Sequence, residues 1–268
     1  MSKKYFESLH HDFLLLKNGS KISFYTEKSS KKPLAVLIHG FGGNAYGMNF
    51  LAQKMSKKWR VLLFEMPNHG KSDFSKIENT AVFQEITDQI IAKIEEKFGK
   101  ISLVVCHSIS CCAISENVSS RISSALITPV FATSPAYNFG AELLFRSKIF
   151  ALISNFWLWS PIKATFLIRN WHKKSVRNVF ENMLHSQPSF RQIIAQAKMS
   201  KIVLEKPLLR ESSKNIKFLI IGGRDGMSEK LSENQREMFF PNAQIHTLKT
   251  GHLLPLEIPE KVAEILQN

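Results

Sequence analysis

The stretch ISLVVCHSISCC, Ile101 to Cys112, decides the fold of this 268-residue chain. Ile101 to Cys106 is a short, mostly apolar run of the kind that forms a strand buried on both faces of a parallel sheet. It leads directly into Ser108, and a helix-like segment follows to about Val118. A serine at a sharp strand-to-helix turn holds its hydroxyl above the sheet, where it can act as a nucleophile. Such a serine can also be a plain helix N-cap, so other residues must decide between the two.

Similar runs recur on both sides of this stretch, separated by helical patterns. Apolar residues repeat every three or four positions between Thr80 and Phe98, which predicts an amphipathic helix. Strands that alternate with helices predict an α/β fold with a mostly parallel central sheet and helices on both faces. The other predicted strands are Leu34–Ile38, Arg60–Phe64, Ala125–Thr128 and Lys217–Ile221, and the other predicted helices are Ser228–Phe240 and Pro259–Gln267.

The alternation stops in the middle of the chain. Residues 139–214 contain no strand-like run and are helical, aromatic and basic, with 13 Lys or Arg against 4 Glu and no Asp from Gly140 to Lys214. We therefore expect a core made of residues 1–138 and 215–268, and a helical cap of residues 139–214 over the carboxyl ends of the strands.

Two further residues stand where a nucleophilic serine would need partners. The chain has only four Asp, and Asp225 alone closely follows a buried strand late in the sequence. His252 lies in the loop after the strand-like segment AQIHTLK. Each residue alone is typical of a turn or a polar loop. Together with Ser108 they follow the chain order Ser, Asp, His used by hydrolases with a strand-turn-helix nucleophile.

A glycine-rich loop follows the first predicted buried strand. It reads His39-Gly-Phe-Gly-Gly-Asn44, and its glycines let the backbone approach other groups closely. A backbone amide of this loop can then face the serine.

These segments resemble those of the α/β-hydrolase superfamily along nearly the whole chain, from about Leu34 to Leu266. HGFGGN resembles the oxyanion loop, PNHGKSD (Pro67–Asp73) the P-x-H-G-x-S turn, and CHSIS the G-x-S-x-G elbow. GGRD resembles the acid loop, and GHLLPLEIPE the closing histidine segment. The elbow departs from the family pattern, because Cys106 and Ser110 replace its two glycines. Both residues are small, so we expect the turn to form.

The resemblance implies a serine hydrolase that cleaves a carboxylic ester or thioester through an acyl-enzyme. It gives Ser108 the role of nucleophile, His252 of base and Asp225 of orienting acid, with the backbone N–H groups of Phe41 and Ile109 as oxyanion hole. No metal or organic cofactor is implied. The alternatives are a C–C bond hydrolase, lyase or acyltransferase on the same triad, a binding protein that kept the fold, or a cysteine nucleophile.

The predicted cap gives the only indication of substrate. Its aromatic and aliphatic side chains can line an acyl pocket or simply pack the cap on the core; the candidates are Phe145, Ile149, Phe156, Trp157 and Trp159. The net charge of the whole chain is +14. It indicates either a basic surface that keeps the protein soluble or an acidic partner, which can be a phosphate-bearing substrate, an acidic carrier protein or an anionic lipid surface. No zinc-finger, homeodomain or RRM motif indicates nucleic acid.

The remaining composition is that of an ordinary globular protein, with 44% apolar and 22% charged residues. The apolar run Phe13–Leu16 is too short for a signal-peptide core, and Ile149–Trp159 is too short to span a membrane. The three cysteines, two of them adjacent, form neither a disulfide framework nor a zinc-site pattern. We therefore expect a cytoplasmic protein.

Overall fold

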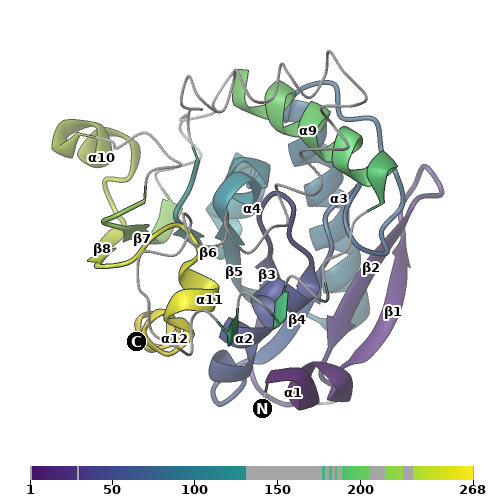
Figure 1. The fold of residues 1–268 in the computed structure, drawn as a ribbon, viewed down its shortest axis with the longest axis horizontal. Coiled ribbons are helices and arrows are strands. Elements are labelled where there is room, and N and C mark those ends of the chain that lie inside the picture. Colours follow the sequence, from purple (N-terminus) through teal and green to yellow (C-terminus); the bar gives the residue numbers. More distant parts are fainter. Residues whose placement is uncertain are drawn as a thin grey trace.

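The structure is a computed structural model that describes residues 2–28, 30–130, 177–178, 181–182, 185, 189–205, 215–225 and 232–267. In these residues eight strands form one sheet in the order β1-β2-β4-β3-β5-β6-β7-β8 (Figure 1). The pairs β1–β2 and β2–β4 are antiparallel, and all the others are parallel. The strands are β1 (His10–Leu15), β2 (Lys21–Thr26), β3 (Leu34–Ile38), β4 (Arg60–Phe64), β5 (Ile101–His107), β6 (Ser123–Ile127), β7 (Ile216–Gly222) and β8 (Gln244–Leu248).

Helices cover both faces of this sheet, as the sequence predicted. Side chains alternate along a strand, so Val36 and Ile38 of β3 belong to one apolar cluster, while Ala35 and Leu37 belong to another. The first cluster includes α3, and the second includes α2 and α12. The helices are α1 (Ser2–Ser8), α2 (Ala45–Met55), α3 (Thr80–Phe98), α4 (Glu116–Arg121), α9 (Phe190–Glu205), α10 (Glu233–Phe239), α11 (Leu254–Glu257) and α12 (Pro259–Leu266), with a 3₁₀ helix, η1 (Ser108–Ala113).

The predicted helix from Ser108 to about Val118 is wrong in its extent. The 3₁₀ helix η1 ends at Ala113, Ile114 is extended with φ −80° and ψ 113°, and α4 starts separately at Glu116. Ser115 explains the break, because its Oγ accepts a hydrogen bond from the Val118 N–H at 3.1 Å and so caps a new helix.

The N-terminal hairpin was not predicted. Strands β1 and β2 pair from His10↔Thr26 to Leu15↔Lys21 around a turn in which Gly19 has φ +82°. The hairpin adds two antiparallel strands to one edge of the sheet, and Figure 1 shows it at the opposite edge from β8.

Most of residues 139–214 lie outside the described residues, so the division into core and cap stays a prediction. The helical character expected near the end of this segment is present in α9, which lies beside α3 (Figure 1). Among the described helices, none is both long and apolar enough to cross a membrane.

Candidate active site

Ser108 lies where β5 turns sharply into η1. Its backbone φ is +60°, which is in the left-handed region that non-glycine residues rarely adopt. Such a conformation costs on the order of 1–3 kcal/mol and is typical of residues held in place for function. The residue is 6% exposed.

The structure brings Ser108, His252 and Asp225 together from the ends of three strands. The Ser108 Oγ lies 2.9 Å from His252 Nε2, and His252 Nδ1 lies 2.8 Å from Asp225 Oδ2. Because the carboxylate accepts at Nδ1, the neutral imidazole carries its proton there, and Nε2 is left to accept the serine proton. All three residues are buried, so the chain of hydrogen bonds is shielded from water.

The backbone of His252 is clamped by two side chains. Its carbonyl oxygen accepts hydrogen bonds from His107 Nε2–H at 2.9 Å and from Thr128 Oγ–H at 3.0 Å. Thr128 is fully buried and has φ +41°, which is an outlier for a β-branched residue. The clamp therefore joins the ends of β5 and β6 to the loop that carries His252.

Glu257 holds the same loop from its other side. Its carboxylate accepts from the backbone N–H groups of Gly251 at 3.2 Å and Leu253 at 3.3 Å. Position 222, at the end of β7 and next to this loop, requires glycine, because a Cβ there would lie 2.0 Å from the Gly251 carbonyl oxygen. The backbone on both sides of His252 is thus fixed by hydrogen bonds.

The glycine-rich loop Gly40–Asn44 lies against Ser108. A Cβ on Gly40 would come within 2.8 Å of the Ser108 Cβ, so this backbone is as close to the serine as packing allows. The Gly40 carbonyl accepts from the Gly43 N–H at 3.1 Å and from His39 Nδ1–H at 2.8 Å, and Gly42 has φ +66° within the turn. In a trans peptide the N–H points opposite to the C=O, so the Phe41 N–H points away from these partners.

Two buried histidines support this loop. His39 Nε2 accepts from the Met66 N–H at 3.1 Å, and the His39 and His69 ring centroids are 4.9 Å apart. Burial lowers the pKa of His39 well below its usual value and lowers the pKa of His69 to about 4. Burial likewise lowers the pKa of His107 to about 3, so all three rings are neutral near pH 7.

The two unusual elbow residues fit the turn without glycine. Cys106 is fully buried in the apolar cluster that includes α3. Ser110 Oγ accepts from the His107 N–H at 2.9 Å, and it lies 2.9 Å from the His107 carbonyl oxygen and 3.2 Å from that of Ile38. Ser110 therefore fastens the elbow to β3 through its own side chain.

The cysteine alternative is disfavoured by burial. Cys106, Cys111 and Cys112 are free and buried. Burial raises the pKa of Cys112 to about 12 and raises the pKa values of the other two thiols as well. The nucleophilic form of cysteine is the thiolate, which these environments suppress.

Sequence reasoning missed the supporting residues His107, Thr128 and Glu257. Their positions at strand ends or in motifs were visible, but their contacts to the base or the oxyanion loop depend on the folded loops. The acyl-pocket candidates Phe145, Ile149, Phe156, Trp157 and Trp159 lie outside the described residues. The stretches that are described hold no group of three or more His, Cys, Asp or Glu placed to bind a metal ion.

Comparison with known families identifies the class. The sequence profile described as "Alpha/beta hydrolase family" matches residues 35–265, so the chain belongs to this family. No curated protein matches the sequence.

Solved structures of this fold resemble the chain closely at low sequence identity. A provisionally assigned acyltransferase from Salmonella enterica has a TM-score of 0.78 and 16% identity, covering 98% of this chain and 95% of the other. The enol-lactonase from Burkholderia xenovorans LB400 has a TM-score of 0.71 and 14% identity, covering 96% and 98%. A carboxylesterase from Nitrososphaera gargenis has a TM-score of 0.71 and 16% identity, covering 96% of each chain. At these identities the likeness shows the fold alone.

Proposed function

We propose that the protein is a serine hydrolase that cleaves a carboxylic ester or thioester, with Ser108, His252 and Asp225 as its catalytic triad. The observation that carries the proposal is the continuous chain from Ser108 Oγ through His252 to Asp225, with distances of 2.9 Å and 2.8 Å. Each distance is within the range in which a base can take a proton from its nucleophile.

In the first half-reaction the Ser108 oxygen attacks the carbonyl carbon while its proton passes to His252 Nε2. The tetrahedral intermediate then collapses, the bond to the leaving alcohol or thiol breaks, and His252 returns the proton to that group. Asp225 stabilises the imidazolium that exists between these two transfers.

The oxyanion of the intermediate would be held by the N–H groups of Phe41 and Ile109. The close approach of Gly40 to Ser108 supports this assignment, as does the direction of the Phe41 N–H away from the groups that bond the Gly40 carbonyl. In the second half-reaction water, deprotonated by His252, attacks the acyl carbon. The bond from this carbon to Ser108 Oγ then breaks, the carboxylic acid leaves, and His252 returns the proton to Oγ.

Turnover of p-nitrophenyl esters of increasing acyl length tests the proposal. We expect the wild type to hydrolyse at least one of them and Ser108→Ala to lose roughly 10⁴- to 10⁶-fold in kcat. Ser120→Ala is the matched control, because Ser120 is exposed on α4 and donates only to the Asn117 carbonyl. Wild-type inactivity on every chain length, or activity that survives in Ser108→Ala, would contradict the esterase assignment.

A further inference from the structure

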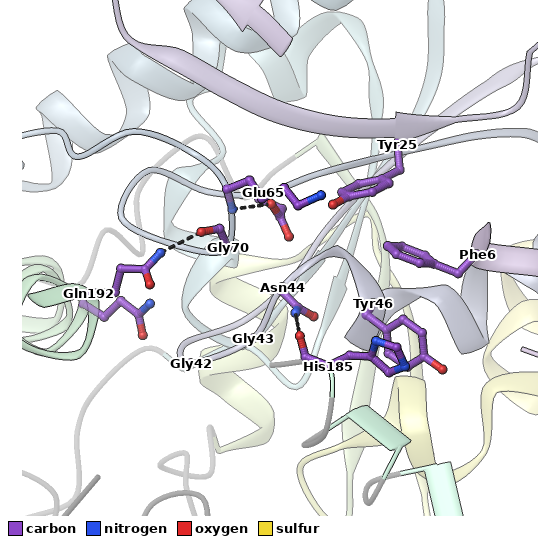
Figure 2. Close-up of a pocket in the computed structure, with 12 residues that line it drawn as sticks. Phe6, Tyr25, Gly42, Gly43, Asn44, Tyr46, Glu65, Gly70, His185 and Gln192 are labelled. Carbon is purple, nitrogen blue, oxygen red and sulfur yellow. Dashed lines mark hydrogen bonds between the residues drawn. The ribbon is translucent and has the colours of Figure 1, made fainter. Parts of the chain in front are cut away.

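A cavity of about 320 Å³ lies beside the oxyanion loop (Figure 2). Gly42 and Gly43 line it, whereas Ser108 and His252 do not. Its volume is at the lower end of the range for small-molecule sites, roughly 300–1,000 Å³. The cavity is therefore large enough for one part of a substrate.

The carboxylate of Glu65 forms a polar wall of the cavity. It is 3% exposed, and it accepts from the backbone N–H groups of Lys71 at 2.7 Å and Ala45 at 3.4 Å. The Ser23 side chain hydrogen-bonds to it as well. A carboxylate offers about four acceptor positions, so these three donors still leave capacity for a ligand. Burial raises the pKa of Glu65, while these hydrogen bonds and the charge of Lys71 lower it.

The rest of the lining includes the ammonium group of Lys71, a set of aromatic rings and the amide side chains of Asn44, Gln192 and Gln196. Lys71 is exposed, and its Nζ lies 5.8 Å from the centre of the Tyr25 ring. The Tyr25 ring is 4.6 Å from that of Phe6, and the Tyr46 ring stacks on His185 at 3.9 Å. Figure 2 shows Glu65 between Tyr25 and the oxyanion-loop residues, with the aromatic rings on one side of the cavity.

This combination of groups selects among ligand chemistries. An alkyl chain would cover Glu65 without giving it a hydrogen bond, and an anion would be repelled by it. A cation would meet the ammonium of Lys71 and the positive charge of the whole chain. A hydroxyl group can donate to the carboxylate and accept from the ammonium, while carbon-bound hydrogens of the same molecule pack on the aromatic rings.

The cavity is also within reach of the reacting carbonyl. Phe41, the proposed oxyanion donor, directly precedes the two glycines that line the cavity, and consecutive Cα atoms are about 3.8 Å apart. A group attached to the bound carbonyl can therefore cross the side-chain-free backbone of Gly42 and Gly43 and enter. Since the lining suits hydroxyls and not an alkyl chain, the group that enters is the alcohol part of the ester.

We propose that this cavity is the leaving-group subsite of the enzyme and takes a neutral alcohol that carries further hydroxyl groups. The proposal rests on the esterase function above, and it narrows the substrate class to esters of polyhydroxylated alcohols. Glu65 accepts and Lys71 donates the hydrogen bonds that recognise those hydroxyls.

Three hexanoate esters that differ only in the alcohol test the subsite. The alcohols are propanol, glycerol attached at its terminal carbon, and choline, and hydrolysis is followed by titrating the released acid. We expect kcat/KM for the glyceryl ester to exceed that for the propyl ester by about tenfold, the worth of one hydrogen bond to a charged group. Lys71→Met should reduce this ratio severalfold, because only the hydrogen bond to Glu65 remains. Lys57→Met, which removes an exposed lysine in the turn after α2, should leave the ratio unchanged.

Three results would overturn the subsite: a glyceryl-to-propyl ratio of one or less, an unchanged ratio in Lys71→Met, or a preference for the choline ester. In each of these cases, hydrolysis of the propyl ester would still support the esterase function. Binding of free glycerol, measured by saturation-transfer NMR against propanol, gives a readout without catalysis. Saturation of glycerol that weakens in Lys71→Met supports the subsite, and equal saturation of both alcohols contradicts it.

Discussion

Two loops meet at Ser108, and different kinds of contact fix them. The base loop, Gly251–Leu253, is held by side chains: His107 and Thr128 donate to the His252 carbonyl, and Glu257 accepts from the N–H groups on either side. The oxyanion loop, Gly40–Asn44, is held by its own backbone turn, by His39 on the Gly40 carbonyl, and at its far end by the Asn44 side chain, which donates to the His185 carbonyl.

The difference predicts different sensitivities. The base loop can lose one hydrogen-bonding side chain and keep the others. Single substitutions among these side chains should therefore lower kcat only moderately. The oxyanion loop depends on the absence of side chains, because a Cβ on Gly40 has no free space. The addition of a single methyl group to this loop should therefore lower kcat strongly.

The largest loss of kcat is expected for Asp225→Asn, which changes the partner of the base His252. The amide presents a donor where His252 Nδ1–H needs an acceptor, so the imidazole adopts the wrong tautomer. We expect kcat on a p-nitrophenyl ester to fall by about 10⁴-fold with little change in the free energy of unfolding. A loss of less than tenfold would remove Asp225 from the triad.

Gly40→Ala should have the next largest effect and tests the oxyanion loop. The new Cβ would meet Ser108 Cβ at 2.8 Å and His107 Nδ1 at 3.0 Å, so the loop must move. Loss of one oxyanion donor in this way should lower kcat by about 100- to 1000-fold. Urea unfolding would show whether the protein is still folded, and full activity in a folded variant would contradict the assignment.

Lowering the pH should reduce the stability of the folded protein, because the histidines that support the oxyanion loop are buried and neutral. The pKa of His69 is about 4 in the folded state against 6.5 for the free side chain, so the unfolded chain binds more protons between these values. Stability is then fully present above about pH 7 and falls as the pH is lowered toward 4, by about 3 kcal/mol for His69 alone.

Urea midpoints at pH 7, 6, 5 and 4.5 measure this loss. His69→Asn, which removes the titrating group and keeps an amide donor for the Pro67 carbonyl, should flatten the dependence. Identical slopes for the two proteins would show that His69 does not contribute.

The smallest of these effects is expected for Thr128→Val, which tests the graded response of the base loop. It removes one of the two donors to the His252 carbonyl at nearly constant shape, and kcat should fall by about tenfold. Thr128→Ser keeps the hydroxyl and should restore most of the rate. Thr87→Val is the matched control, because the buried Thr87 hydroxyl donates to the Phe83 carbonyl within α3. Equal loss of activity in both valine variants would indicate a general structural effect.

Much of the core could be predicted from the sequence because its signals are local. The buried runs at β3, β4 and β5 and the periodicity of α3 directly reflect burial on the sheet. The N-terminal hairpin was missed because only one residue of β1 is buried and its apolar residues are consecutive and do not alternate with polar ones.

The candidate site likewise contains residues that local sequence motifs predict and residues that only the folded structure reveals. Ser108, Asp225 and His252 stand in motifs with a fixed order, whereas the roles of Thr128 and Glu257 exist only once distant loops meet. The break in the helix after the elbow depends on the competing cap at Ser115, which the apolar pattern did not reveal.

Labelling with a fluorophosphonate tests the central claim, an activated Ser108 beside a properly held His252, most directly. The reagent reacts with a serine only when a base removes its proton, and peptide mass spectrometry locates the adduct. We predict one adduct per chain, on Ser108, that is lost in His252→Ala. A folded wild type that stays unlabelled, or that is labelled at another residue, would contradict the account.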